Sequence, residues 1–204
     1  MRFALTYCGI ALGIVAGMVA TDILSPARAD DCPGATALRS SFIAERGDGS
    51  KVSVSHLADG IVRTIYRVRD YTALETTEFQ GLFPLERIDR GRRTTFQPKV
   101  DLKTLFPLRV GRNITATFDA EESGKAFTVT FALVVRKTDT LSIGTCKYAV
   151  FQIEKSEGRG GQAPIFINTD YYAANLKMII AKEYKERGGA STWVKYDKVY
   201  FVEP

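Results

Sequence analysis

Hydrophobic and polar residues alternate with a period of two along most of the chain from residue 40 onward. In residues 61–69, for example, Val62, Tyr66 and Val68 fall on one face of an extended chain. This alternation, broken by glycine-containing turns, is typical of antiparallel strands. We predict strands at 41–46, 51–57, 61–69, 72–79, 113–120, 125–137, 147–156 and 192–201. The pattern predicts a mainly β fold, an antiparallel meander forming a curved sheet or half-barrel, with at most one or two short helices.

One segment, 170–187, fits two interpretations. Its alanines, leucine and methionine favour a helix between Asp170 and the glycines at 188 and 189. The same residues also alternate as a strand would, and 192–201 needs a partner across those glycines. We favour one helical turn at 171–175 that leads into a strand, and a full helix packed on the sheet remains the alternative.

The tetrapeptide Leu-Phe-Pro-Leu occurs twice, at 82–85 and at 105–108. Four residues are too few to indicate an internal duplication. Proline has no backbone N–H and is confined to the edges and ends of strands. We therefore interpret each tetrapeptide as an apolar plug at the end of a strand.

The first 29 residues have the organisation of an export signal. A basic start is followed by a nearly continuous apolar stretch, 3–20, and by Ala27, Arg28 and Ala29 behind Pro26. Small residues in these positions suit signal peptidase, so we expect cleavage after Ala29 and a single exported domain, 30–204, in the periplasm. An uncleaved membrane anchor is the alternative, because the apolar stretch is almost long enough to span a bilayer.

Two cysteines, Cys32 and Cys146, remain after that cleavage. In an oxidising compartment an even number of cysteines favours pairing, and we predict a disulfide between them. The alternative, a nucleophilic Cys146, lacks a nearby base, because His56 is the only histidine in the chain. A zinc site with two histidine ligands is excluded for the same reason, and we expect no metal and no cofactor.

Residues 86–112 contain eight basic and three acidic residues. Arginine forks match the geometry of phosphates and carboxylates, so this basic stretch is the candidate site for an anionic ligand such as lipopolysaccharide or peptidoglycan. The candidate residues are Arg87, Arg90, Arg92, Arg93, Lys99, Arg109 and Arg112. The alternative, a solvated loop whose arginines pair with their neighbours, is the interpretation we favour.

Other features indicate binding more than chemistry. The chain after residue 29 carries 26 basic and 22 acidic residues, too even a balance for a nucleic-acid partner. Ser55 and His56 would point to opposite faces of a strand, as would Glu75 and Glu78, so neither pair predicts catalysis. Late aromatic residues suit either a binding surface or cross-strand packing, and we favour packing. They are Tyr148, Tyr171, Tyr172, Tyr184, Trp193, Tyr196 and Tyr200.

The order of segments in residues 80–200 resembles a broad group of exported bacterial β-sheet proteins, mostly of unassigned function. The resemblance is carried by residues 105–112, by the sequence Ile-Gly-Thr-Cys at 143–146, and by 169–173 with 179–184. Some members look like the curved half-barrel of lipoprotein carriers. The chain departs from the group at Asn175 and Leu176, where proline and glycine are usual, and at Cys146, where an aromatic residue is common. The resemblance implies an exported β fold and supplies no catalytic residue.

These observations predict an exported, non-catalytic protein of the cell envelope that acts by binding a protein partner or an anionic polymer. We expect no nucleic-acid partner and no membrane span after cleavage. The alternative is a periplasmic carrier of a lipid or another apolar ligand. Its half-barrel cavity would be lined by the inward faces of strands, including Val129, Phe131, Leu133 and Val135.

Overall fold

The computed structural model describes residues 32–34, 41–162, 166–185 and 191–202. The predicted signal sequence and its cleavage site lie outside these ranges. No helix within them is both long enough and apolar enough to cross a membrane. Regular helix is limited to two 3-10 turns in the described ranges, Ala58–Gly60 and Leu102–Leu105.

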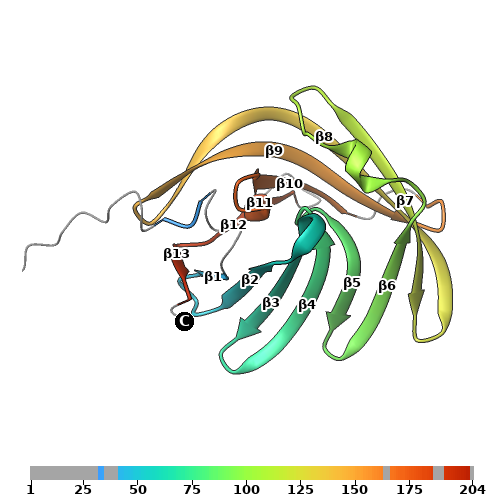
Figure 1. Cartoon of the computed structure of the whole chain (residues 1–204), viewed down its shortest axis with the longest axis horizontal. Helices are drawn as coiled ribbons and strands as arrows, with labels where there is room; N and C mark the ends of the chain where they lie inside the picture. Colours follow the sequence, from blue (N-terminus) through green and yellow to red (C-terminus); the bar gives the residue numbers. More distant parts are fainter. Residues whose placement is uncertain (1–31, 35–40, 163–165, 186–190, 203–204) are drawn as a thin grey trace, which may run out of the picture.

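All thirteen strands of the described residues belong to one antiparallel, curved sheet, which confirms the predicted fold class (Figure 1). Strands β1 to β11 follow each other in chain order, so each strand from β2 to β11 pairs with the strands before and after it. The first six are β1 (Phe42–Glu45), β2 (Lys51–His56), β3 (Ile61–Val68), β4 (Tyr71–Phe79), β5 (Phe83–Asp89) and β6 (Arg92–Pro98). The others are β7 (Asn113–Glu122), β8 (Lys125–Ile143), β9 (Cys146–Arg159), β10 (Phe166–Ala173), β11 (Met178–Lys185), β12 (Ser191–Lys195) and β13 (Lys198–Phe201).

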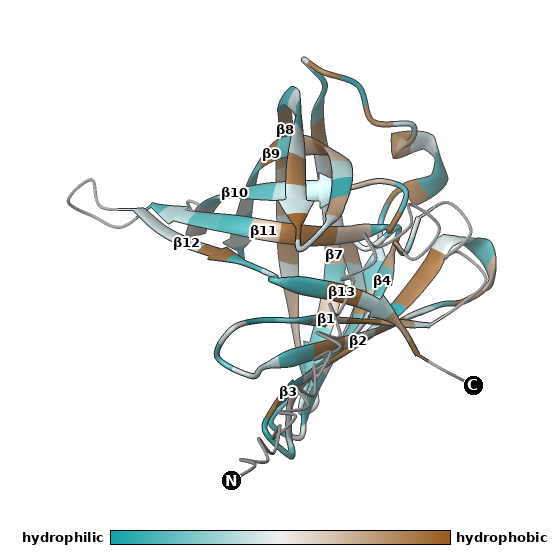
Figure 2. Ribbon diagram, turned by 90° about the vertical axis from the view of Figure 1, so that its left-hand side faces the viewer, coloured by the Kyte–Doolittle hydropathy of each residue, from teal (hydrophilic) through white to brown (hydrophobic). Residues whose placement is uncertain are grey.

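Alternation along the chain accounts for the strands that the sequence predicted. In β7 every second residue from Ile114 to Ala120 is buried, and its neighbours face outward. The same alternation continues into β8, whose Val129, Phe131, Leu133 and Val135 are all buried. Figure 2 shows hydrophobic and hydrophilic bands following one another along these strands.

Strands β5 and β6 were not predicted. Pro84 stands near the start of β5, where the pairing register with β4 shifts between Thr77 and Glu78. Such a bulge accommodates a residue that cannot donate a backbone hydrogen bond. In β6, Thr94 and Phe96 are buried between exposed neighbours, so the basic stretch contains a strand pair rather than a loop alone.

The segment 170–187 is extended, so a full helix is excluded for its described part. The expected helical turn at 171–175 is also wrong, because Tyr171–Ala173 belong to β10, and the chain turns at 174–177 before β11. A shift of register between Tyr171 and Tyr172 marks a bulge at this end of β10. Pairing with β9 on one side and β11 on the other outweighs the helix propensity of the alanines.

The predicted strand 192–201 is two strands. β12 pairs with β11 at one edge of the sheet, and β13 pairs with β1 at the opposite edge. Only Tyr196 and Asp197 lie between them, and Figure 2 shows the chain passing from one to the other. The Tyr196 N–H donates to the Ile180 carbonyl at 3.4 Å and the Asp197 N–H donates to the Glu45 carbonyl at 2.8 Å. These two residues therefore join the two edges of the curved sheet.

Two hydrophobic cores fill the molecule. The first packs β1, β2 and β13 against the joined ends of β8 and β9 and against β10 and β11. Its buried residues include Phe42, Val54, Tyr148, Leu176 and Ile180. The second lies inside the bend formed by β4 to β9 and includes Leu82, Phe83, Phe118, Phe131 and Ile153.

The loop at 80–82, between β4 and β5, connects these two regions. Gly81 adopts a φ of +66°, and a Cβ atom on it would lie 1.8 Å from the Lys177 carbonyl oxygen in the β10–β11 turn. The Tyr172 hydroxyl donates to the Gln80 carbonyl at 2.7 Å, and the Lys155 ammonium donates to the Leu82 carbonyl at 3.1 Å. Glycine is required here, because both the space and the backbone angle exclude a side chain.

Candidate ligand-binding cleft

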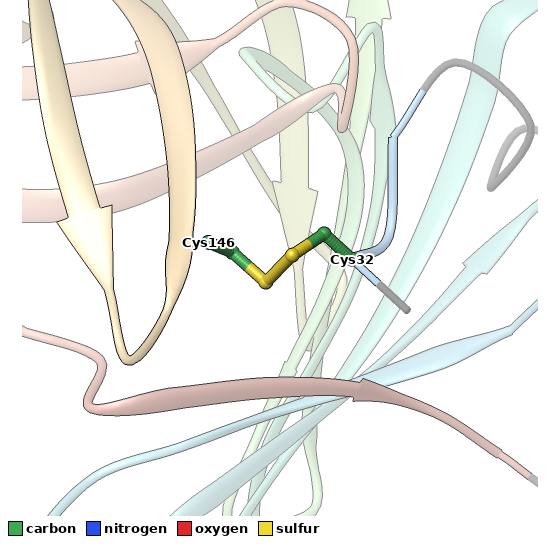
Figure 3. The surroundings of a disulfide bond; sticks show 2 residues. All are labelled: Cys32 and Cys146. Atoms are coloured by element: carbon green, nitrogen blue, oxygen red, sulfur yellow. A yellow bond between two sulfur atoms is a disulfide. The ribbon is translucent and has the colours of Figure 1, made fainter. Parts of the chain in front are cut away.

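The predicted disulfide is present. Cys32 and Cys146 are joined across 114 positions of sequence, with their Cα atoms 5.7 Å apart. Figure 3 shows Cys146 at the start of β9 and Cys32 on the short segment that lies beside it. The disulfide holds the segment 32–34 against the end of the long β8–β9 hairpin and the first core.

The basic stretch is not one surface. Arg87, Arg90, Arg92 and Arg93 lie on the β5–β6 hairpin, whereas Lys99, Arg109 and Arg112 follow the other end of β6. Because β6 has seven residues, its ends are separated by about 20 Å. A small ligand cannot contact both groups at once.

Several of these side chains already have partners. Arg93 pairs with Glu86, and Lys99 lies 2.7 Å from Asp119. The Arg112 guanidinium donates to the carbonyls of Pro107 and Thr104 at 2.9 and 3.0 Å, so it stabilises the loop between β6 and β7. The Arg87 guanidinium carbon lies 5.8 Å from the centre of the Phe96 ring. Arg92 and Arg109 are exposed and form no ion pair with the described residues.

The weak catalytic candidates are held apart. The Ser55 hydroxyl hydrogen-bonds the Ser41 hydroxyl at 3.0 Å, and His56 Nε2 hydrogen-bonds the Leu176 carbonyl at 2.9 Å. Glu75 pairs with Arg63 on the outer face, whereas Glu78 faces inward. No group of three or more His, Cys, Asp or Glu residues suited to a metal ion occurs in the part of the chain that the structure describes.

A cleft opens between two parts of the sheet that are far apart in sequence. Its first wall is formed by β2, β3 and β4, and its second by β11, β12 and Tyr196. The volume is about 300 Å³, at the small end of the range for ligand sites. The walls lie opposite each other because the sheet curves back on itself and residues 196 and 197 join its edges.

Three tyrosines contribute to the cleft, Tyr66 from the first wall and Tyr184 and Tyr196 from the second. Tyr184 is 43% exposed, and the other two are partly buried. Burial raises the pKa of the Tyr196 hydroxyl well above its usual value. The hydroxyls of Thr64 and Thr76 on the first wall bond each other at 2.7 Å. The cleft therefore presents aromatic faces beside neutral hydroxyl groups.

The charge of the cleft is mainly positive. Arg46, Lys177, Lys182 and Lys195 line it, against one carboxylate, Glu78. The Arg46 guanidinium forms an ion pair with the Asp48 carboxylate at 3.1 Å. Lys195 is exposed and forms no ion pair with any described residue. An anionic group that entered the cleft would find Lys195 available without breaking an existing pair.

Lys182 is held in place by a buried carboxylate. Its ammonium lies 3.5 Å from Asp170 Oδ1, on the neighbouring strand, and Asp170 is fully buried. The Asn168 amide donates to the same oxygen, and Oδ2 has no hydrogen-bond partner among the described residues. Burial lowers the pKa of Lys182, but the nearby Asp170, Tyr184 and Glu78 outweigh it, so the pKa is raised. Lys182 is therefore a fixed cation at the wall of the cleft.

A second lysine lies on the same face in β9. Lys155 is half-buried, and its ammonium lies 5.4 Å from the centre of the Phe131 ring. Burial lowers the pKa of Lys155, and Asp170 offsets this only in part. Lys155 holds the loop 80–82, whose Gly81 forms part of the cleft.

The late aromatic residues divide between packing and the cleft. Tyr148 and Tyr172 are buried, and the rings of Tyr171 and Trp193 meet at 4.5 Å between centres. Tyr184 and Tyr196 line the cleft. The Tyr200 hydroxyl donates to Glu45 at 3.1 Å. The favoured packing interpretation fits Tyr148, Tyr171, Tyr172 and Trp193, and binding by Tyr184 and Tyr196 stays a prediction.

The lining proposed for an apolar carrier is packed instead. Val129, Phe131, Leu133 and Val135 are each at most 1% exposed and belong to the second core. The rings of Phe118 and Phe131 lie 5.4 Å apart, edge to face. None of these residues lines the cleft.

Comparison with known proteins assigns no family to this chain. No family model matches the sequence, and no curated protein matches it. Among solved structures, the chain is similar to the crystal structure of the hypothetical lipoprotein YmcC from Escherichia coli. That match has 11% sequence identity and a TM-score of 0.45, and it covers 76% of this chain and 86% of that chain. It assigns no ligand, partner or activity to this chain.

Proposed function

We propose that this protein is exported to the cell envelope and acts by binding an acidic, ring-containing ligand in the cleft between β2–β4 and β11–β12. Export is supported by the apolar leader, residues 1–29, and by a disulfide, which persists in oxidising compartments. The ligand class suggested by the cleft is a carboxylated or phosphorylated saccharide, such as a segment of an envelope polymer.

The observation that carries the proposal is the meeting of cations and tyrosine rings in one cleft. Lys195 supplies an unpaired charge for an acidic group, and Lys182, whose charge Asp170 balances, supplies a fixed hydrogen-bond donor. Tyr66, Tyr184 and Tyr196 supply ring faces and hydroxyls. Aromatic faces pack against sugar rings while the hydroxyls hydrogen-bond them. Lys182 is already fixed by Asp170, so little side-chain entropy is lost when a ligand binds.

The single tryptophan provides an assay. Trp193 lies in β12, next to Val194 and Lys195 of the cleft, and its fluorescence can report ligand binding. We would titrate the purified protein with an N-acetylmuramyl peptide, which carries carboxylates, and with an uncharged N-acetylglucosamine oligosaccharide. We expect saturable binding of the acidic compound alone.

Variants locate the site. Lys195→Gln removes an exposed, unpaired cation and should weaken binding about tenfold, the loss of one charge-assisted contact. Lys147→Gln makes the same change on an exposed part of β9, outside the cleft, and should leave the affinity unchanged. Equal affinity for both saccharides, or equal affinity of Lys195→Gln and the parent protein, would refute the proposal.

A carrier of a small apolar ligand is the second candidate. It is favoured by Leu74, Ile179 and Val194, which also line the cleft. Native mass spectrometry of protein purified from the envelope tests it. A co-purifying lipid, displaced by Leu74→Asp, would support a carrier, and a ligand-free mass would count against it.

A further inference from the structure

Two hairpin tips stand side by side at one end of the sheet. They are the β3–β4 tip, residues 67–71, and the β5–β6 tip, residues 89–93, and together we call them the hairpin rim. The Arg90 N–H donates to the Ala73 carbonyl at 3.2 Å, which holds the two tips together. Figure 1 shows both hairpins projecting in the same direction.

The hairpin rim is strongly basic. It contains five arginines and two aspartates and no lysine. Arg67, Arg69 and Arg92 are exposed and form no ion pair with the described residues. Arg90 is 77% exposed and lies 3.9 Å from Asp89, so that pairing is weak in water. Arginine forks bind phosphate oxygens in pairs, which an ammonium group cannot do.

The last strand pair before the β3–β4 turn is apolar and aromatic. Val68 and Tyr71 are directly opposite each other across the hairpin, and they are 42% and 57% exposed. Both side chains therefore expose apolar surface to solvent at the end of a projecting hairpin. At a membrane interface, a tyrosine places its ring among the headgroups and keeps its hydroxyl in water.

Both tips place an arginine in a left-handed backbone conformation. Arg69 has a φ of 55° and Arg90 a φ of 49°, the left-handed region in which glycine and asparagine fit at lower cost. Arginine at these positions makes the turns less stable than they could be.

We propose that the hairpin rim docks on the surface of an anionic lipid bilayer. The exposed arginines bind phosphate headgroups, and Val68 and Tyr71 enter the interfacial layer. Charge alone would suit a soluble anionic polymer equally well, and the exposed valine and tyrosine favour the bilayer. None of the residues of the rim lines the cleft, so the two binding activities can be tested separately.

The test is co-sedimentation of the disulfide-bonded protein, starting at Asp30, with vesicles. We expect binding to vesicles of phosphatidylglycerol and phosphatidylcholine in equal parts, and none to phosphatidylcholine alone. The quadruple variant Arg67→Gln, Arg69→Gln, Arg90→Gln and Arg92→Gln should bind at least about tenfold more weakly, because each basic residue contributes near an anionic surface. Circular dichroism verifies that each variant is folded.

A charge-matched control separates the rim from net charge. The quadruple variant Lys103→Gln, Arg109→Gln, Lys147→Gln and Lys198→Gln removes four exposed cations elsewhere and should retain most of the binding. Tyr71→Ser should weaken binding to vesicles but leave binding to dextran sulfate unchanged. The proposal fails if anionic vesicles are not bound, or if the control variant loses as much binding as the rim variant. It also fails if Tyr71→Ser binds vesicles like the parent, which would indicate a soluble polymer as the partner.

Discussion

Replacement of Gly81 by alanine tests the contact that joins the first half of the sheet to the β10–β11 turn. The added Cβ would lie 1.8 Å from the Lys177 carbonyl oxygen and 2.7 Å from its carbonyl carbon. Both are backbone atoms, so no side-chain rotation relieves the clash. The loop 80–82 or the turn 174–177 must therefore move, and with it the wall of the cleft.

The magnitude has two parts. Alanine at a φ of +66° costs about 1–2 kcal/mol relative to glycine. Overpacking at a tight contact adds about 1–3 kcal/mol. We expect Gly81→Ala to lower the free energy of unfolding by about 2–5 kcal/mol. The control is Gly91→Ala, because Gly91 has a φ of +81° but nothing within 4 Å of its added Cβ, so only the backbone cost applies.

Urea unfolding followed by Trp193 fluorescence and by circular dichroism measures both variants with the disulfide intact. The difference between Gly81→Ala and Gly91→Ala isolates the contact from the backbone angle. If the two variants lose equal stability, the loop and the turn do not touch as described. The argument that links the cleft wall to this loop would then be refuted.

Three further predictions concern stability. Replacing Cys32 and Cys146 by serine should lower the free energy of unfolding by about 4–5 kcal/mol, because the disulfide closes a loop across 114 positions. Urea unfolding with and without reductant measures this loss. An unchanged free energy of unfolding in the double variant would contradict the prediction. Tyr172→Phe should lower the free energy of unfolding by about 1 kcal/mol, since the Tyr172 hydroxyl donates to the Gln80 carbonyl. Tyr148→Phe should leave the free energy of unfolding unchanged at neutral pH, because the buried Tyr148 hydroxyl has no partner among the described residues. Burial also raises the pKa of Tyr148 to about 12, so the folded state retains a proton that the unfolded chain releases near its ordinary value of 10.0. Stability should therefore fall as pH rises between these values, and unfolding curves of Tyr148→Phe should lack that part of the decline.

The sequence predicted the elements whose signal is local. The alternation of hydrophobic and polar residues predicted β2, β3 and β7, and the even number of cysteines after the export signal predicted the disulfide. It missed β6, although Thr94 and Phe96 alternate with polar neighbours, because the surrounding arginines indicated a loop. It also joined β12 and β13, since a run of aromatic and β-branched residues does not reveal that its two halves pair at opposite edges.

The cleft depends on non-local structure. Its walls come from β2–β4 and β11–β12, and only curvature and register bring Tyr66 near Tyr184. The sequence analysis named Tyr184 and Tyr196 among the late aromatic residues, but nothing in the sequence indicated that they lie near Lys182. A partial signal was present in β9, where Lys155 stands two positions after the buried Ile153 and so shares its face. A charged residue at an inward position of a strand is a marker to look for.

The link between β12 and β13 has a consequence for how the protein is made. Strands β1 to β11 can pair in the order in which they are synthesised, since each lies beside its predecessor. Both outer flanks of that assembly, along β11 and β1, stay uncovered until residues 191–201 arrive, and a single stretch of chain then covers both. Uncovered flanks of this kind recruit strands from other copies. A chain interrupted before residue 191 is therefore incomplete at two places at once. The complete chain instead ends its sheet in β12 and β13, two short edge strands of five and four residues, and short edges offer less backbone for another copy to pair with.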